Sequence, residues 1–251
     1  MAACSHAKGS LPAWAPHQGP VKPGRQAHAP GLSKAARGPC ASPDSPARGL
    51  WPMVSVLRTA LAASARLAVG EAITNLLAAP IAGLDEVKLS ANWMAAASQP
   101  GEDAALYQAV QAVGMELCPA LDISIPVGKD SLSMQSRWQI DGETHASASP
   151  VSLIISAFAR VADVRGQSTP LLDTSSPSDI WLIGLGAGKK RMGGSILAQV
   201  QNRIGGECPD LDSPALLAAL AKLIISARAQ GLSRAYHDRS DGGAFAALCE
   251  M

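Results

Sequence analysis

Apolar and polar positions follow helical spacing in four stretches of the chain. The run 59–79 is rich in alanine and leucine and contains no proline, which is typical of a helix. A second helix is predicted over 102–117, with acids in its first turn and an apolar stripe behind them. The stretch 214–230 predicts a third helix with Ser213 as its N-cap. Residues 243–251 begin a fourth, for which no stop signal is present.

Strand patterns lie between these helices. Residues 86–93 alternate apolar and polar side chains, and shorter apolar runs follow at 123–127 and 134–140. Asp141-Gly142 is a hairpin turn signal. The run 151–161 is the most apolar of all, so we expect it to be a central strand.

A second unit follows a linker that is rich in serine, threonine and proline, at 166–178. We expect a strand over 179–185, a glycine-rich loop over 186–194, a helix over 195–204 and a short strand over 232–236. The mixture of helices and strands predicts the α+β class.

The N-terminal segment, residues 1–56, is unlike the rest. Proline recurs in this segment, Asp44 is the one acidic residue in it, and no helical or strand period is present. Such a segment buries too little apolar surface to offset its ordering entropy, so we expect it to be disordered. Its Arg- and Ala-rich, acid-poor composition has some likeness to an organelle transit peptide. A non-native start, produced by a misplaced gene boundary, is the alternative that we favour. We therefore predict three parts of the chain: the N-terminal segment 1–56, a first folded domain over 57–168 and a second folded domain over 169–251.

Composition narrows the functional classes. The 251 residues carry 21 basic and 20 acidic side chains, which argues against a nucleic-acid binder with a broad basic surface. No run approaches the roughly 20 apolar residues of a membrane span. The cysteines contain no CxxC pair, which argues against a disulfide framework or a zinc site and favours a reducing cytoplasm. They are Cys4, Cys40, Cys118, Cys208 and Cys249.

Glu71 and Asn75 are the first candidate ligands. They are separated by four residues, so on a helix both side chains leave the same face. A carboxylate and an amide carbonyl supply the hard oxygen atoms that Mg²⁺ prefers. The alternative is an ordinary solvated polar face.

The loop 237–243 is the second candidate. Asp238 and Ser240 precede Gly242-Gly243 at the predicted start of a helix, where an acid can hold a metal and backbone N–H groups can face phosphate. An acidic helix cap is the alternative. His237 could act in acid–base chemistry, although packing at a strand end is the more ordinary role.

Two further loops could contact anions. Residues 128–131 supply a cation, an acid and a hydroxyl after a strand, and the alternative is a solvated turn in which Lys129 and Asp130 pair weakly. The glycine-rich loop 183–190 matches neither a Walker A nor a dinucleotide fingerprint, so a plain turn competes with a phosphate-binding role.

Several blocks in register resemble phosphoribosylformylglycinamidine synthase, and specifically the large single-chain bacterial type. The resemblance runs from about residue 60 to the end, whereas residues 1–55 match none of it. The blocks are Ala63–Ala72, Leu89–Met94, Pro100–Asp103, Pro126–Ser131 and Tyr236–Gly243.

The resemblance implies an ATP-dependent C–N ligase of purine synthesis. This family converts formylglycinamide ribonucleotide, ATP and glutamine to the amidine. The fold implied is part of an aminoimidazole-ribonucleotide-synthetase-like N-terminal domain, followed by the start of the matching C-terminal domain. The chain would be an internal fragment of the second synthetase half. In this family that half holds an auxiliary ATP or ADP with Mg²⁺, and the enzyme is expected in the cytoplasm.

The resemblance also implies site residues. Glu71, Asn75 and Asp238 would be Mg²⁺ ligands, Ser240 a nucleotide contact and Ser131 a substrate contact. No catalytic residue carries over, because the first half with its catalytic histidine and the glutaminase domain have no counterpart here. A further metal-binding aspartate upstream of Glu71 is also missing. We therefore expect small-molecule nucleotide partners, neither nucleic acid nor membrane, and no activity without the missing parts. The alternative is a non-catalytic nucleotide-binding or scaffold module.

Overall fold

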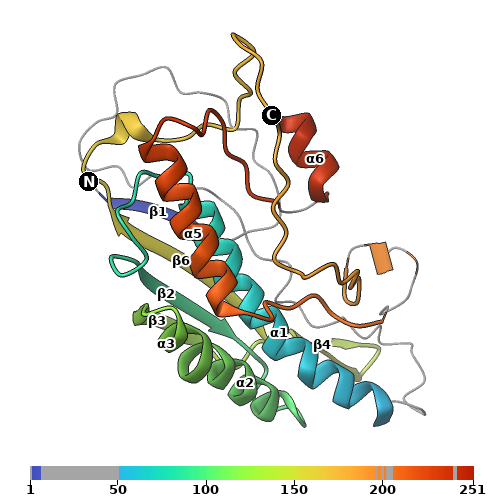
Figure 1. Cartoon of the computed structure of the whole chain (residues 1–251). Coiled ribbons are helices and arrows are strands. Elements are labelled where there is room, and N and C mark those ends of the chain that lie inside the picture. The colour runs from blue at the N-terminus through green and yellow to red at the C-terminus, as the bar shows by residue number, and fades with distance from the viewer. Residues whose placement is uncertain (1, 7–50, 196, 199–200, 202–205, 240–241) are drawn as a thin grey trace.

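The computed structural model describes residues 2–6, 51–195, 197–198, 201, 206–239 and 242–251, and side chains from residue 61 onward (Figure 1). Helices lie over one face of a small mixed sheet, which agrees with the predicted α+β class. The helices of four residues or more are α1 (Trp51–Leu76), α2 (Glu102–Gln111), a π-helix (Ala112–Leu117), α5 (Pro214–Ala229) and α6 (Gly243–Glu250).

The first helix is longer than the sequence pattern predicted. α1 begins at Trp51 rather than near residue 59, so it enters the segment that was predicted to be disordered. Pro52 does not prevent this, because a helix tolerates proline in its first turn, where the missing N–H has no partner to lose. Most of the remaining predicted disorder, residues 7–50, lies outside the described residues.

The second predicted helix is confirmed, but Pro119 does not end it. The π-helix continues α2, and the short helix α3 (Cys118–Ala120) follows with the proline in its first turn. The chain turns only at Asp122, whose φ of 56° ends the helical path.

The main sheet has the order β1-β6-β2-β3 (Figure 1). β6 is antiparallel to both of its neighbours, whereas β2 and β3 are parallel. The predicted central position of the most apolar strand is therefore confirmed. β1 comes from the segment predicted to be disordered, and this short part of that prediction is wrong. The bounds are β1 (Ala2–His6), β2 (Lys88–Met94), β3 (Ser124–Ser131) and β6 (Ser152–Arg160).

The predicted loop at 128–131 is the second half of β3. Its backbone pairs with β2 from Gly128 opposite Ala91 to Ser131 opposite Met94. A Cβ at Gly128 would collide with the backbone oxygen of Ala91. The glycine is therefore explained by the close approach of two strands, rather than by the freedom of a loop.

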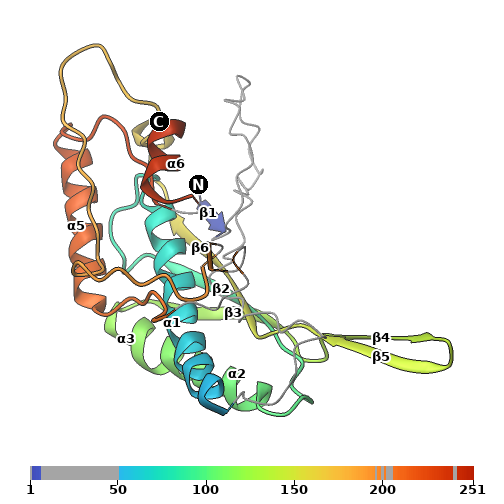
Figure 2. The same cartoon turned by 90° about the vertical axis from the view of Figure 1, so that its right-hand side faces the viewer.

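The predicted hairpin is confirmed and extends away from the body of the protein (Figure 2). It consists of β4 (Gln135–Ile140) and β5 (Glu143–Ala148). Asp141 and Gly142 both have positive φ, of 51° and 85°, as a two-residue type I′ turn requires. Trp138 stacks on His145 across the strands, with ring centroids 5.9 Å apart.

One buried cluster joins the sheet to the helices on both sides of the predicted domain boundary. α1 supplies Ile73 and Leu76, and β6 supplies Ile155. Leu211 and Leu217 from the second predicted domain are buried in the same cluster. The domain boundary at residue 168 stays a prediction. The shared core packs α5 against α1 (Figure 1).

The second predicted unit agrees with the sequence pattern only in part. α5 and its cap are confirmed, since the Ser213 hydroxyl accepts from the backbone N–H of Leu216 at 3.4 Å. Residues 179–185 form no strand, and Trp181 is 77% exposed without a neighbouring strand to pair with. Residues 232–236 form no strand either, and most of the predicted helix at 195–204 lies outside the described residues.

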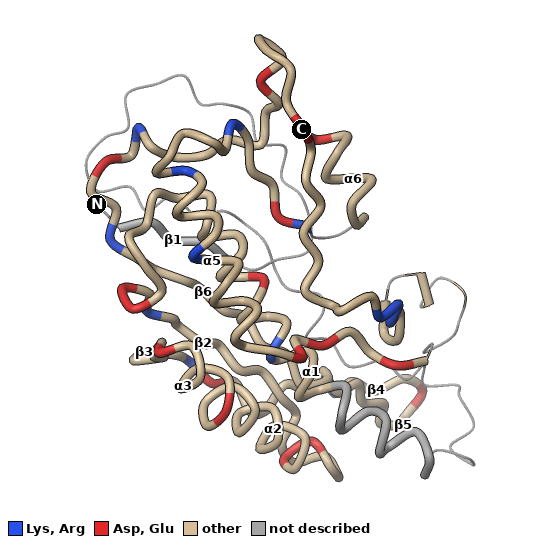
Figure 3. Tube along the Cα trace, in the orientation of Figure 1, with Lys and Arg blue, Asp and Glu red and all other residues tan. Residues whose placement is uncertain are grey.

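Charge is unevenly divided between the helices. α2 and its π-helical continuation carry only acids, whereas α5 carries Lys222 and Arg228 (Figure 3). Within the described part of the chain, no helix is both long enough and apolar enough to cross a membrane.

Candidate functional site

The last turns of α1 present a polar face. Glu71, Thr74 and Asn75 are spaced at i, i+3 and i+4, so their side chains lie close together, and all three are half-buried. The Thr74 hydroxyl donates to the backbone oxygen of Glu71 at 3.0 Å. This face therefore keeps one carboxylate and one amide at the partly buried end of the helix.

A strap of three residues, Tyr236 to Asp238, crosses this end of α1. The Tyr236 hydroxyl donates to the backbone oxygen of Thr74 at 2.8 Å, although the two residues are 162 apart in the sequence. The Tyr236 backbone N–H donates to the Thr169 carbonyl at 3.0 Å. Burial raises the pKa of the Tyr236 phenol, so the hydroxyl keeps its proton and its bond to the helix.

The strap brings Asp238 to Asn75. The Asn75 side chain lies beside the Asp238 carboxyl and lowers its pKa by hydrogen bonding. Only 15% of the Asp238 side chain is exposed. Burial raises the pKa of this carboxyl, and the nearby Glu250 carboxylate adds to the rise, whereas His237 and Asn75 oppose it. Asp238 is thus an acid held out of water beside an amide.

His237 joins the strap to α6. One ring nitrogen, Nε2, lies 3.0 Å from Oε2 of Glu250 in the last turn of that helix. The other, Nδ1, lies 2.5 Å from the backbone oxygen of Asp238 and 3.8 Å from its carboxylate. The histidine is therefore packed between two acids, and no contact places it on a reacting group.

The predicted meeting of the α1 face with the Asp238 loop is observed for Asn75. Glu71 lies one turn earlier on the same face. Among the described residues, no three His, Cys, Asp or Glu side chains gather in a way that could hold a metal ion. The predicted ligand set includes an amide and only two carboxylates. The metal-binding role of Glu71, Asn75 and Asp238 stays a prediction.

Ser240, the predicted nucleotide contact, lies outside the described residues, as does Asp241. The helix that follows is described. Gly242 precedes α6 with a φ of 84°, a conformation that favours glycine, and a Cβ there would collide with the Cβ of Ala246. The glycine at this position therefore has a structural reason.

Ser131, the predicted substrate contact, lies away from the strap. It ends β3 opposite Met94, four residues before the hairpin, whereas Asn75 is at the far end of α1 (Figure 1). An open groove of about 380 Å³ lies along β3 and α2, and Ser131 does not line it. Most of the groove wall is apolar, including Leu106, Val110 and Leu132.

The glycine-rich loop at 183–190 makes ion pairs within the protein. Lys189 lies 3.3 Å from Asp212, and the turn before it places Ala187 and Gly188 at positive φ. Arg191 donates two hydrogen bonds to the Asp212 carboxylate, at 2.7 and 3.0 Å. This cation pairing favours the plain-turn interpretation over a phosphate loop.

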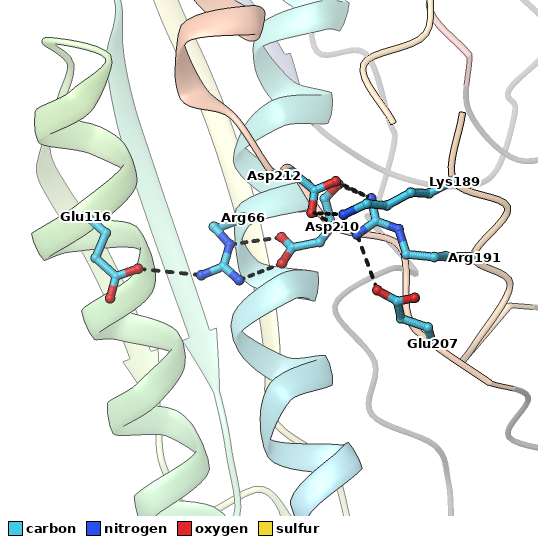
Figure 4. A network of polar contacts seen from close by, with 7 residues as sticks. All are labelled: Arg66, Glu116, Lys189, Arg191, Glu207, Asp210 and Asp212. Atoms are coloured by element: carbon cyan, nitrogen blue, oxygen red, sulfur yellow. Dashed lines mark hydrogen bonds and ion pairs between the residues drawn. The ribbon is translucent and has the colours of Figure 1, made fainter. Parts of the chain in front are cut away.

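These contacts belong to a larger network, which we call the arginine clamp (Figure 4). Arg66 on α1 holds the Asp210 carboxylate through two bonds of 2.9 and 2.7 Å, and lies 3.6 Å from Glu116. The clamp was not predicted from the sequence, because its two key residues are 144 positions apart and neither lies in a distinctive motif. It consists of Arg66, Glu116, Lys189, Arg191, Glu207, Asp210 and Asp212.

The comparison with known families finds one matching model, described as FGAR-AT PurM_N-like domain, over residues 44–160. The match covers α1, the β2–β3 pair, the hairpin and β6. It begins at residue 44, so the expectation that residues 1–55 match nothing in the family is wrong for the last part of that segment. The matched residues form helices packed on a mixed sheet, in agreement with the α+β class. The match supports placing this part of the chain with the PurM-like domains of the FGAR amidotransferase family.

Proposed function

We propose that this chain holds a nucleotide with Mg²⁺ as part of an FGAR amidotransferase of the large single-chain type. That enzyme is the glutamine-dependent ligase that converts formylglycinamide ribonucleotide to the amidine at the expense of ATP. The observation that carries the proposal is the contact between the strap and α1, where the Tyr236 hydroxyl bonds to Thr74 and the Asp238 carboxyl lies beside Asn75. Two parts of the chain that share no local sequence relation meet there.

The residues suit a hard divalent cation. Mg²⁺ is commonly held by one or two carboxylates together with phosphate oxygens, rather than by an all-protein cage. An amide offers an oxygen to a cation and N–H donors to a carboxylate, so the Asn75 side chain can serve both. A buried carboxylate that lies near a second one gains from a cation that balances the charge. Glu71, Asn75 and Asp238 would hold the ion, and the ion would neutralise phosphate charge.

The role that we propose for this chain is binding rather than chemistry. His237 contacts Asp238 and Glu250, and the clamp arginines are occupied by carboxylates. Neither arrangement offers a group to a reacting phosphate. The nucleotide would therefore be a structural ligand that fixes the strap against α1.

Calorimetry with the 251-residue chain tests the proposal. Mg-ADP should bind, and ADP with excess chelator should bind at least about tenfold more weakly. Asp238→Ala and Glu71→Ala should each lower the Mg-ADP affinity by about tenfold or more, in proteins with unchanged circular dichroism. Glu86→Ala, which removes an exposed acid in the turn before β2, is the matched control.

Two outcomes would count against the proposal. A folded wild-type chain that does not bind Mg-ADP would remove the nucleotide role. Formation of the amidine by this chain from ammonia and ATP would show that it is a catalyst and not only a holder. Binding without turnover, lost in both alanine variants, is the expected result. If this binding does not change when the missing synthetase half is added, a stand-alone binding module is favoured.

A further inference from the structure

We propose that Glu250 is a positioning residue for Asp238 and acts through His237. This inference rests on the proposed function, since it concerns the same site. The geometry is a chain of contacts from the Glu250 carboxylate in the last turn of α6, through the His237 ring, to the backbone oxygen of Asp238 on the strap. The packing of α6 would in this way set the position of Asp238, a proposed cation ligand that lies outside that helix.

The imidazole has a contact on each side. Glu250 holds Nε2 at 3.0 Å, and the Asp238 backbone oxygen holds Nδ1 at 2.5 Å. A ring that is held at both nitrogens cannot rotate about its Cβ–Cγ bond without losing one contact. Only 16% of the His237 side chain is exposed, so neighbouring atoms restrict it further. The ring is therefore a fixed spacer between helix and strap.

The other end of the strap is fixed independently. Tyr236 is bonded to Thr74 through its hydroxyl and to Thr169 through its backbone N–H. Asp238 therefore has an anchor on the α1 side at Tyr236 and another on the α6 side at His237. With both anchors present, the carboxylate is held beside Asn75. Without the second, its backbone is free to turn away.

α6 is itself fixed at the end that carries Glu250. The Leu172 backbone N–H donates to the Met251 carbonyl at 3.0 Å, so the last turn is bonded to the segment that follows the sheet. Glu250 is 28% exposed and lies in this turn. A helix end that is tied down can hold a neighbouring ring in place, whereas a fraying end cannot. The contact to His237 is thus made by the turn of α6 next to this bond.

Glu250 acts at a distance from the ion rather than as a ligand. Among the described side chains, His237, Asp238 and Glu250 do not form a group that could itself hold a metal. Groups that orient metal ligands from behind typically affect metal affinity by 10–100-fold. A positioning role therefore predicts a large effect on binding and a small one on folding.

Four variants test the inference by Mg-ADP calorimetry and by paramagnetic resonance of Mn²⁺ added without nucleotide. Glu250→Ala should raise the dissociation constants for Mg-ADP and Mn²⁺ by about tenfold. Glu250→Gln should restore binding to within about threefold of wild type, because its amide oxygen still accepts from the histidine. His237→Gln and His237→Asn each keep a donor at one of the two ring positions, and both should weaken binding. Phe245→Ala, at an 80% exposed position of the same helix, is the control.

The outcomes separate the two proposals. If the wild-type chain binds neither Mg-ADP nor Mn²⁺, both the proposed function and this inference are overturned. If wild type binds and a folded Glu250→Ala variant binds equally well, only the inference fails. Should Glu250→Ala not fold, the glutamine variant decides. A Glu250→Gln protein with native circular dichroism and tenfold weaker binding would show that charge, rather than position, is what matters.

Discussion

The arginine clamp and the Asp238 strap are both polar attachments to α1, but they differ in how their charges are balanced. In the clamp, Arg66, Lys189 and Arg191 face carboxylates at distances between 2.7 and 3.9 Å (Figure 4). At the strap, the groups that the described residues place beside Asp238 and Glu250 are a histidine and an amide, and no arginine or lysine is among them. The clamp is complete by itself, whereas the strap gains from a cation.

The difference suggests which polar cluster serves which purpose. Arginine and carboxylate in a two-bond arrangement satisfy each other and leave little to offer a ligand. Acids that lie together out of water are unfavourable unless something positive joins them. By this criterion the clamp is structural and the strap is the ligand site. The following four predictions test that division.

The largest effect is expected from Leu211→Ala. Leu211 is 7% exposed, lies between the two clamp aspartates and packs near Gly70 of α1. Its truncation should lower the free energy of unfolding by about 3 kcal/mol, measured by urea denaturation. Leu232→Ala, at a site that is 72% exposed, is the control and should change little. A loss no larger than in the control would show that this segment does not secure α5 to α1.

Arg66→Met should have the next largest effect on stability. It removes the two bonds to Asp210 and leaves a half-buried carboxylate without its partner. We expect a loss of about 1–2 kcal/mol after allowance for solvent screening, with Mg-ADP affinity unchanged. Arg165→Met removes a similar but fully exposed pair with Asp163 and should leave stability unchanged. A loss of Mg-ADP affinity in Arg66→Met would contradict the structural role of the clamp.

The clamp should also give stability a dependence on acid pH. Arg191 and then Lys189 lower the pKa of Asp212 below its ordinary value of 3.8. The folded protein therefore binds this proton less readily than the unfolded chain does. The stabilisation is complete above pH 3.8 and is lost as the pH falls through the lower folded value. The difference in stability between wild type and Asp212→Asn should shrink in that range. A difference that is constant with pH would exclude the ionised pair as its cause.

The smallest effect is expected from Glu102→Gln, which removes the charge of an acid that belongs to neither the arginine clamp nor the Asp238 strap. The Val151 backbone lowers the pKa of its carboxyl, and Oε2 is buried without a hydrogen-bond partner among the described residues. Burial raises the pKa of Glu102, so the folded state loses stability as the carboxyl ionises with rising pH. Glutamine removes that loss, and we expect a gain of about 0.5 kcal/mol or less at neutral pH, seen as a higher melting temperature. A decrease would show that the charge is stabilising.

Glu102 also sharpens the comparison. It is a partly buried acid with a raised pKa, yet neither an amide side chain nor a second carboxylate contributes to that shift. Burial of one carboxylate is therefore not enough to mark a ligand site. The strap differs because the amide of Asn75 and a second acid converge on Asp238.

Much of the fold could be predicted from local sequence. The spacing of apolar residues located α1, α2 and α5, and Ser213 and the Asp141-Gly142 pair marked a helix start and a hairpin turn. The predictions failed where a strand depends on a neighbour. Residues 128–131 became strand because β2 lies alongside, and residues 179–185 did not because no strand of the described residues pairs with them.

The candidate site was predicted in the same uneven way. Helical spacing alone placed Glu71 and Asn75 on one face, and the Asp238 motif drew attention to its loop. The anchoring roles of Tyr236 and Glu250 were missed, because a tyrosine or glutamate has no distinctive sequence signal before its partner is known. Ser240 lies outside the described residues, and its role stays a prediction.

The sequence by itself determined the long helices and the hairpin turn of this protein, since helix period and turn residues act over a few neighbouring positions. Only the tertiary structure decided which distant residues meet: Arg66 with Asp210, and Asn75 with Asp238. The reason is that these contacts follow from the shared core that packs Leu211 and Leu217 on α1. Packing of that kind depends on side-chain shape in three dimensions, which no local pattern records.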